Sequence, residues 1–394
     1  MGGAEMNEWK KVKLGEITQI IDGDRGKNYP KDRDFLNNGY CLFLNTGNVT
    51  QNGFTFESNQ FISKDKDEQL RKGKLLRGDL VYTTRGTVGN VAYYGDTIPF
   101  NHIRINSGMV ILRVGHNVNP IFIYQLLKSK TYRTYFKSFC TGSAQPQLPI
   151  KNLSQILIDV PDVITQNHIA TILSRYDSLI ENYQKQIKLL EEAAQRLYKE
   201  WFVDLHFPGH ENTKIVDGVP EGWELSKLGN LAEFKRGKTI TKKDVIDGSI
   251  PVVAGGLEPA YYCNKSNTAE RVITISGSGA NAGFTKMYFE KVWASDCSYA
   301  DLETTQFLHF VYCYLKDNKT TIDHMQKGAA QPHVYAKEIN ALGLCIPTED
   351  VLNIFEIKVS RYFNTISSLQ SQIRLLTEAR DRLLPKLISG KIAV

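Results

Sequence analysis

Residues 166–203 read QNHIATILSRYDSLIENYQKQIKLLEEAAQRLYKEWFV, a long stretch with regularly spaced apolar residues. Their spacing alternates between four and three, which is the a/d pattern of a coiled-coil seam, and charged or amide residues fill the outward positions. A helix of this length spans roughly 55–60 Å and needs a partner to bury its seam. We therefore expect a long helix over residues 163–204. The apolar positions are Tyr176, Ile180, Tyr183, Ile187, Leu190, Ala194, Leu197 and Trp201.

A second copy of this stretch lies 186 positions further on, where QKQIKLLEEAAQRL is echoed by QSQIRLLTEARDRL. One copy alone fits a bundle core or a homodimer seam, whereas two matched copies in one chain favour an intramolecular antiparallel coiled coil. Pro385 replaces Lys199 and should end or kink the second helix near Leu384. The predicted helix-pair interface comprises Tyr176, Ile180, Tyr183, Ile187, Leu190, Leu197, Tyr362, Ile366, Leu369, Ile373, Leu376 and Leu383.

The repeat extends beyond the helices. Trp9, Leu14, Gly15 and Gly23 recur 214 positions later as Trp223, Leu228, Gly229 and Gly237, and GSAQPQLPIKNL at 142–153 recurs 186 positions later as GAAQPHVYAKEI. The offset falls by 28 between these motifs, so the two copies share their ends and differ in their middles. A duplicated scaffold has kept its frame while its loops, where binding specificity can change, have diverged.

The pattern predicts an α+β fold with a pseudo-twofold internal repeat. Each copy has β-rich runs, at 80–84, 89–94 and 109–114 and again at 271–275 and 282–289, with helices near 121–137 and 306–316. Proline and glycine mark a connector between the copies. The expected order is a first globular domain at 1–162, a long helix at 163–204, a connector at 205–219, a second globular domain at 220–348, and a second long helix with the tail at 349–394.

Composition sets loose limits on function. The 394 residues are 42% hydrophobic and 23% charged, and the net charge of +6 permits a polyanionic partner. Six cysteines form no CxxC pair, which favours free thiols in a reducing compartment. The sequence shows no signal peptide and no apolar run of about 18 residues, so we expect a cytoplasmic protein without a membrane partner.

Together these motifs resemble the specificity subunit of a type I restriction-modification system. The resemblance covers nearly the whole chain and rests on the paired openings WKKVKLGEI and GWELSKLGNL, the loop TRGTVGNVA, the GSAQPQL and GAAQPHV motifs, the two long helices and the LISGKI ending. It implies two target-recognition domains that each read half of a bipartite DNA site, held apart by the helices. It also implies a non-catalytic subunit with no cofactor of its own, partnered by two methyltransferase and two restriction subunits that bind S-adenosylmethionine, ATP and Mg.

Basic loops are the first candidates for DNA contact, because Lys and Arg bind phosphates and Arg, Asn and Gln read base edges. A lone basic loop would more simply be a solvated surface. Recurrence after Leu14-Gly15 and Leu228-Gly229 favours the functional interpretation. The candidates are Arg25, Lys27, Lys31, Arg33, Arg85 and Thr87 in the first domain, and Lys235, Arg236, Lys238, Lys242 and Lys243 in the second.

The glutamine motifs add Gln145, Gln147, Gln331 and His333, with Lys151 and Lys337 downstream. These side chains could touch DNA, or proline could fix the corner while glutamine bonds local backbone.

Residues 277–282 fit GxGxxA, but the residues after them are predicted to form a strand, so the helix N-terminus of a dinucleotide site is missing. We instead match this loop to TRGTVGN, with Ser276 at the position of Arg85. Ser276, Ser278 and Asn281 become candidate DNA contacts. His206 and His210 have helical metal-ligand spacing, but the intervening Pro208 argues against a zinc site, and we predict no metal and no catalytic residue.

Two other functions stay open at this point. The chain could be a coiled-coil adaptor that binds no DNA, or an enzyme that binds a nucleotide at the loop beginning at Gly277. Salt-sensitive retention on duplex DNA would separate the first from a DNA-reading subunit, and nucleotide-binding calorimetry would test the second.

Overall fold

The computed structural model describes residues 9–142, 145–241, 243, 245–326, 332–392 and 394. The chain divides into two compact units, unit 1 (1–181 and 373–394) and unit 2 (182–372). Two long helices, α6 (Val163–Tyr198) and α11 (Glu349–Ile388), each contribute one segment to both units. The domain limits given by the sequence pattern stay predictions.

Unit 1 is built around a four-stranded antiparallel sheet in the order β2-β10-β7-β8. A three-stranded sheet, β6-β3-β9, pairs β3 with β9 in parallel, and β1 pairs with β11. The predicted strand at 109–114 is confirmed residue for residue, and the runs at 80–84 and 89–94 contain β7 and β8. The strands are β1 (Lys10–Lys13), β2 (Thr18–Asp22), β3 (Cys41–Leu44), β4 (Val49–Thr50), β5 (Gly53–Phe54), β6 (Phe61–Ile62), β7 (Leu80–Thr83), β8 (Val91–Tyr93), β9 (Ile103–Ile105), β10 (Met109–Val114) and β11 (Leu157–Val160).

The single helix predicted near 121–137 is two helices. Ser129 has extended backbone angles (φ −63°, ψ 143°), and its hydroxyl accepts a hydrogen bond from the Tyr132 amide at 3.3 Å, so it caps the second helix. Serine competes for backbone hydrogen bonds in this way, which is why it interrupts an otherwise periodic stretch. The helices that precede α6 are α1 (Leu14–Ile17), α2 (Lys64–Gln69), α3 (Pro120–Lys128), α4 (Lys130–Lys137) and α5 (Ile150–Gln155).

Unit 2 repeats this plan. Its main sheet runs β15-β21-β18-β19, its second sheet β17-β16-β20 again contains one parallel pair, and β14 pairs with β22 as β1 does with β11. The predicted α+β fold with an internal repeat is confirmed. The elements are β12 (Ile215–Val216), β13 (Val219–Pro220), β14 (Glu224–Lys227), α7 (Leu228–Leu231), β15 (Lys235–Arg236), β16 (Ile250–Val253), β17 (Tyr261–Cys263), β18 (Val272–Ser276), β19 (Thr285–Tyr288), β20 (Trp293–Ala294), β21 (Cys297–Asp301), α8 (Leu308–Asp317), α9 (Lys319–His324), α10 (Ala336–Asn340) and β22 (Gly343–Ile346).

Close backbone approaches explain two of the repeated glycines. A Cβ added at Gly23 would lie 2.3 Å from the carbonyl oxygen of Asn106, and one added at Gly237 would lie 2.4 Å from that of Ser295. Both distances are far below van der Waals contact, so only glycine fits where the chain leaves the first strand of each main sheet.

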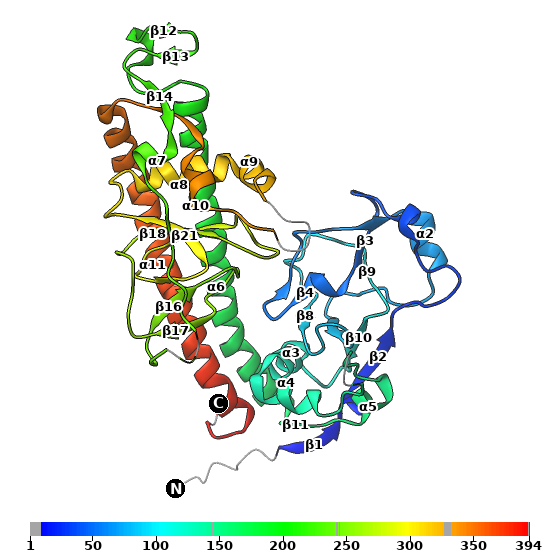
Figure 1. Cartoon of the computed structure of the whole chain (residues 1–394). Coiled ribbons are helices and arrows are strands. Elements are labelled where there is room, and N and C mark those ends of the chain that lie inside the picture. The colour runs from blue at the N-terminus through cyan, green and yellow to red at the C-terminus, as the bar shows by residue number, and fades with distance from the viewer. Residues whose placement is uncertain (1–8, 143–144, 242, 244, 327–331, 393) are drawn as a thin grey trace. The chain divides into compact units, whose positions relative to one another are not determined.

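The long helices pack in opposite directions. In unit 1, Ile169 and Leu173 of α6 share a core with Leu384 and Leu387 of α11. In unit 2, Tyr198 of α6 packs in one core with residues near the start of α11, including Phe355, and the segments of both helices that belong to this unit run side by side (Figure 1). Early α6 therefore meets late α11, and late α6 meets early α11, as an antiparallel pair requires.

The predicted helix-interface residues differ in burial. Ile366 and Leu369 are buried, whereas the other ten are partly exposed. The apolar stripe is broader than the predicted seam, because each helix also covers a domain core. The buried helix residues absent from the predicted set include Ile169, Ala170, Leu173, Tyr198, Phe355, Val359, Phe363, Leu384 and Leu387.

Pro385 does not end the second helix near Leu384, so that part of the expectation was wrong, while a kink there stays a prediction. The helix continues to Ile388, and the Ser389 amide donates to the carbonyl of Pro385 at 3.1 Å. A proline this close to the helix C-terminus removes only one backbone donor. At the matched position of the first copy, α6 passes into a π-helical turn at Lys199–Val203.

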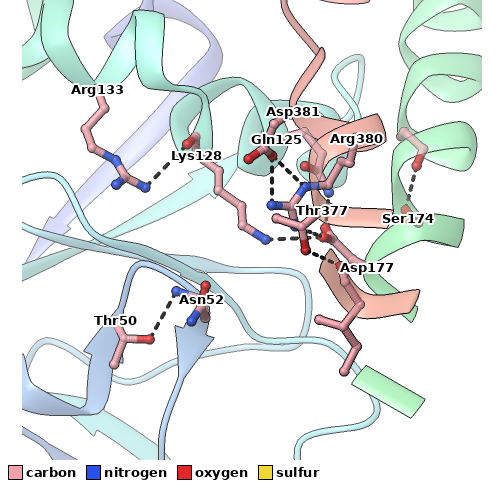
Figure 2. Close-up of polar contacts among 12 residues, drawn as sticks. Thr50, Asn52, Gln125, Lys128, Arg133, Ser174, Asp177, Thr377, Arg380 and Asp381 are labelled. Atoms are coloured by element: carbon pink, nitrogen blue, oxygen red, sulfur yellow. Dashed lines mark hydrogen bonds and ion pairs between the residues drawn. The ribbon is translucent and has the colours of Figure 1, made fainter. Parts of the chain in front are cut away.

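A polar cluster attaches α3 of unit 1 to both long helices (Figure 2). Asp177 of α6 accepts hydrogen bonds from Gln125 Nε2 at 2.5 Å and from Arg380 Nη1 at 2.7 Å, and its carboxylate lies 3.3 Å from Lys128 Nζ. Burial raises the pKa of Asp177, but Lys128, Gln125 and Arg380 outweigh it, so the pKa lies below its usual value. The Asp177 carboxylate therefore contributes to unit 1 in its charged form.

Candidate nucleic-acid interface

Two of the predicted basic loops of unit 1 meet at one end of the main sheet. The loop after β2 contacts the turn that precedes β10, because Arg25 Nη2 lies 3.3 Å from the carbonyl oxygen of Ser107. The loop after β7 contacts the same turn, since the amides of Thr84 and Arg85 both donate to the carbonyl of Gly108, at 2.9 and 3.1 Å. Arg25 and Arg85, 60 positions apart, therefore flank one turn.

The first glutamine motif joins this end of the sheet. Thr141 and Gln147 exchange two backbone hydrogen bonds, of 2.7 and 2.9 Å, and Gln147 forms a β-bridge with Arg85. The amide of Leu148 donates to the carbonyl of Thr84 at 3.0 Å. The TRGTVGN and GSAQPQL motifs, which the sequence analysis identified separately, thus form one surface.

The basic loop after β2 is held in shape by a buried carboxylate. Asp24 accepts hydrogen bonds from the backbone amides of Gly26 and Arg71, both at 2.8 Å. Burial raises the pKa of Asp24, but these amides outweigh it and the pKa is lowered. The cations on and near this loop face solvent: Arg25, Lys27, Lys31, Arg33, Arg85 and Lys151 are exposed, as are Thr87 and Gln145, while Gln147 is half-buried.

Sequence reasoning missed two cations on α4. Arg133 and Lys137 line a cavity of about 580 Å³ together with the predicted Thr87 and with Pro146 of the glutamine motif. Their spacing of four residues within the predicted helix was an available signal, because residues i and i+4 share one helix face.

Unit 2 brings together the equivalent segments. The Gly237 amide donates to the carbonyl of Cys297 at 2.8 Å, and the Gly277 amide donates to that of Asp296 at 3.1 Å, so the loops after β15 and β18 again meet the turn before the central strand. The Val334 amide donates to the carbonyl of Gly277 at 3.1 Å, which brings in the described end of the second glutamine motif, residues 332–334.

The hydrogen bonds correct the match between the two loops. The Val334 bond to Gly277 repeats the Leu148 bond to Thr84, and the β-bridge between Ser278 and His333 repeats the one between Arg85 and Gln147. Ser278, and not Ser276, therefore occupies the position of Arg85.

The two loops also differ in length. The carbonyl of Thr83 accepts from Gly89, six residues on, but that of Ser276 accepts from Gly283, seven residues on, so the second loop is one residue longer. Ser276 itself is buried, and its hydroxyl donates to the carbonyl of Gly255 at 3.1 Å. The segment after this loop is strand β19, as predicted, and supplies no helix N-terminus for a nucleotide phosphate.

Most of the other candidate DNA-contact residues of unit 2 are exposed to solvent. Ser278, Asn281 and His333 are half-buried, and the two glutamine-motif rings of His333 and Tyr335 stack with centroids 5.9 Å apart. Lys242 and Gln331 lie outside the described residues. The exposed cations are Lys235, Arg236, Lys238, Lys243 and Lys337.

A cavity of about 220 Å³ brings together Arg236, Gly277, Asp296, Tyr335 and Lys337. Asp296 and Tyr335 had not been identified from the sequence, because nothing local signals that the turn before β21 lies beside the end of β15.

No helix among the described residues is long and apolar enough to cross a membrane. Across the same residues, no group of three His, Cys, Asp or Glu side chains is placed to hold a metal ion. The rings of His206 and His210 do lie close, with centroids 5.3 Å apart.

Comparison with known proteins identifies the class. The family model of the type I restriction modification DNA specificity domain matches residues 6–192 and 220–374, once for each copy of the repeat. Because these matches cover most of the chain, the chain belongs to this family.

Named relatives agree with this assignment. The specificity subunit of the type I restriction enzyme MjaIX from Methanocaldococcus jannaschii is 29% identical over 343 residues, which cover 81% of this chain and 78% of that protein. The HindI specificity subunit from Haemophilus influenzae is 24% identical, over 98% of this chain and all (100%) of that protein. The crystal structure of an S subunit from M. genitalium has the same fold, with a TM-score of 0.60 at 17% identity over 98% of each chain.

Proposed function

We propose that this chain is the sequence-reading subunit of a type I restriction-modification complex. The observation that carries the proposal is the repeated surface: in each unit, the loops after the first and third strands of the main sheet meet the described part of the glutamine motif at one sheet end. Loops held on a rigid sheet can vary in sequence without unfolding the core, which suits a module that must read different sites.

The side chains on these surfaces suit duplex DNA. Exposed cations in both units can neutralise phosphates, while Arg85, Gln147 and His333 offer donors and acceptors for base edges. The equivalent positions carry different residues, Arg85 with Gln147 in unit 1 and Ser278 with His333 in unit 2. We therefore expect an asymmetric bipartite target whose two halves differ in sequence.

The chain would also assemble the complex, docking two methyltransferase and two restriction subunits. A repeated outward helix face supports two copies of one partner. Leu189 of α6 and Leu375 of α11 are matched by the 186-residue offset, and both are largely exposed, at 59% and 61%. Their neighbours Glu192 and Arg196 recur as Glu378 and Arg382. An exposed leucine at matched positions of the two helices would offer the same apolar contact to two copies of one partner.

Catalysis in this proposal belongs to the partners. The chain would bind no cofactor, while S-adenosylmethionine, ATP and Mg²⁺ would be bound by the methyltransferase and restriction subunits.

Native mass spectrometry of the chain co-expressed with its methyltransferase subunit tests the assembly. Leu189→Glu or Leu375→Glu should reduce two bound methyltransferase subunits to one, and the double variant should bind none. Leu179→Glu is the control, because Leu179 is an exposed leucine of α6, at 42%, that has Thr365 at the matched position. Two bound subunits in the double variant would contradict this docking face.

A further inference from the structure

Unit 2 places an arginine beside a carboxylate at the end of the main sheet. Arg236 is the last residue of β15; its side chain is 67% exposed, and its Nη2 lies 3.6 Å from Asp296 Oδ1. The other oxygen of Asp296, Oδ2, accepts a hydrogen bond from the Ser278 hydroxyl. The Asp296 carboxylate thus connects the end of β15 with the loop between β18 and β19.

We propose that Arg236 reads a guanine in the half-site bound by unit 2, and that Asp296 is its positioning residue. Arginine recognises guanine by two parallel hydrogen bonds to O6 and N7, which requires a fixed guanidinium plane. A carboxylate beside the guanidinium favours one orientation of that plane and leaves other N–H donors available to DNA. The proposal rests on DNA reading by this surface, as argued above.

Unit 1 has a different pair at this sheet end, in which Arg25 Nη2 lies 3.2 Å from Asp22 Oδ1. Asp22 of unit 1 is equivalent to Arg236, since Asp22 pairs with Val110 as Arg236 pairs with Ser298 on the central strand. Gly108 is equivalent to Asp296. The carbonyl of Gly108 accepts a hydrogen bond from the amide of Thr84, which follows β7, and the carbonyl of Asp296 accepts one from the amide of Gly277, which follows β18.

Arg236, Asp296 and Ser278 of unit 2 thus correspond to Asp22, Gly108 and Arg85 of unit 1. Unit 1 forms the same sheet end without the network, so the fold does not require it. The same place in the two units therefore presents different donors and acceptors, which is what distinct half-sites need.

The residues around Arg236 suit a contact in a DNA groove. Tyr335 and Lys337 line the same cavity of about 220 Å³ as Arg236 and Asp296. Lys337 is exposed and supplies a cation for an adjacent phosphate. The guanidinium thus lies beside a positive group, and its acidic partner is already engaged by Ser278.

Selection of bound duplexes from a random DNA library by the purified full chain tests the proposal. Arg236→Gln should reduce discrimination at one G·C pair of one half-site by about 10-fold or more, and leave the other half-site unchanged. Asp296→Asn should weaken discrimination at that same base pair, and Asp296→Glu should restore part of it. A merely structural role for Asp296 would instead change overall affinity without changing base preference.

Lys291→Gln is the matched control, because it removes one exposed cation. Lys291 follows the end of β19, at the opposite end of the sheet from the loop between β18 and β19. It should leave base preference unchanged. If Arg236→Gln weakens all sequences equally and lowers the salt slope by about 1, Arg236 contacts phosphate and the proposal is wrong. Unchanged selection by Arg236→Gln would overturn it as well. If the wild-type chain selects no sequence at all, both the guanine contact of Arg236 and the proposed reading of DNA by this surface are wrong.

Discussion

Arg380 of α11 donates a hydrogen bond from Nη1 to the carboxylate of Asp177 of α6 at 2.7 Å. The two residues lie on different long helices, and the same carboxylate bonds Gln125 of α3 (Figure 2). At the position of Arg380, the first copy has the buried Ala194, and there the neighbouring Gln195 donates to the carbonyl of Cys313 in α8 at 3.1 Å. The two copies therefore attach their domains to the helix pair by different chemistry.

Asp177→Ala should destabilise unit 1 by about 3 kcal/mol, because it leaves Arg380 and Lys128 partly buried without their shared carboxylate. Hydrogen exchange should show faster opening of α3 and of the adjoining part of α6. Asp381→Ala is the control: Asp381 also pairs with Arg380, but its side chain is 58% exposed, so a change below about 1 kcal/mol is expected. Equal effects of the two substitutions would show that the contact with Asp177 has no special role.

The same carboxylate should make unit 1 sensitive to acid. The folded pKa of Asp177 is lowered, so its contribution is fully present above the unfolded value of about 3.9 and is lost as pH falls through the folded pKa. The stability difference between wild type and Asp177→Asn should therefore shrink as the pH falls below about 4. Hydrogen-exchange rates of α3 amides across this pH range would measure the stability difference. A difference that grows as the pH falls would contradict a lowered pKa for Asp177.

Replacing Arg25, Lys27 and Lys31 with Ala should weaken binding to duplex DNA and flatten its salt dependence. Each phosphate contact that is lost should reduce the slope of log K against log salt by about 0.9. Filter binding at several salt concentrations measures the slope. The control replaces Lys10, Lys11 and Lys13 of β1, which are also exposed and remove the same charge. Equal slopes for both triple variants would argue against phosphate contact by the loop after β2.

Gly237→Ala should destabilise unit 2 by about 1–3 kcal/mol, because the new Cβ would lie 2.4 Å from the backbone oxygen of Ser295 and the chain must shift. Gly343→Ala is the matched control in the same unit, since a Cβ there meets nothing within 4 Å. Its effect should stay within about 0.5 kcal/mol. Urea unfolding of both variants tests the prediction, and a stable Gly237→Ala protein would show that the close approach is not required.

The sequence was sufficient for the features that follow a regular pattern. The a/d spacing indicated the long helices, and the apolar runs indicated strands such as 109–114. Both patterns arise directly from which residues an element must bury. The sequence did not reveal the break at Ser129, where one side-chain cap ends the helical pattern, or the position of Ser278, because the match of the two loops depends on backbone hydrogen bonds between distant segments. The contact of Asp296 with Arg236 depends on strands paired across 60 positions, and no local pattern encodes it.

The central claim is that two unlike recognition surfaces on one chain define one split DNA target. Single-molecule sequencing for methyladenine, in cells that express the chain with its methyltransferase subunit, tests it most directly. The account predicts a motif of two different half-sites separated by a gap of fixed length. Absence of methylation despite stable co-purification of the two subunits, or one contiguous motif without a gap, would contradict it.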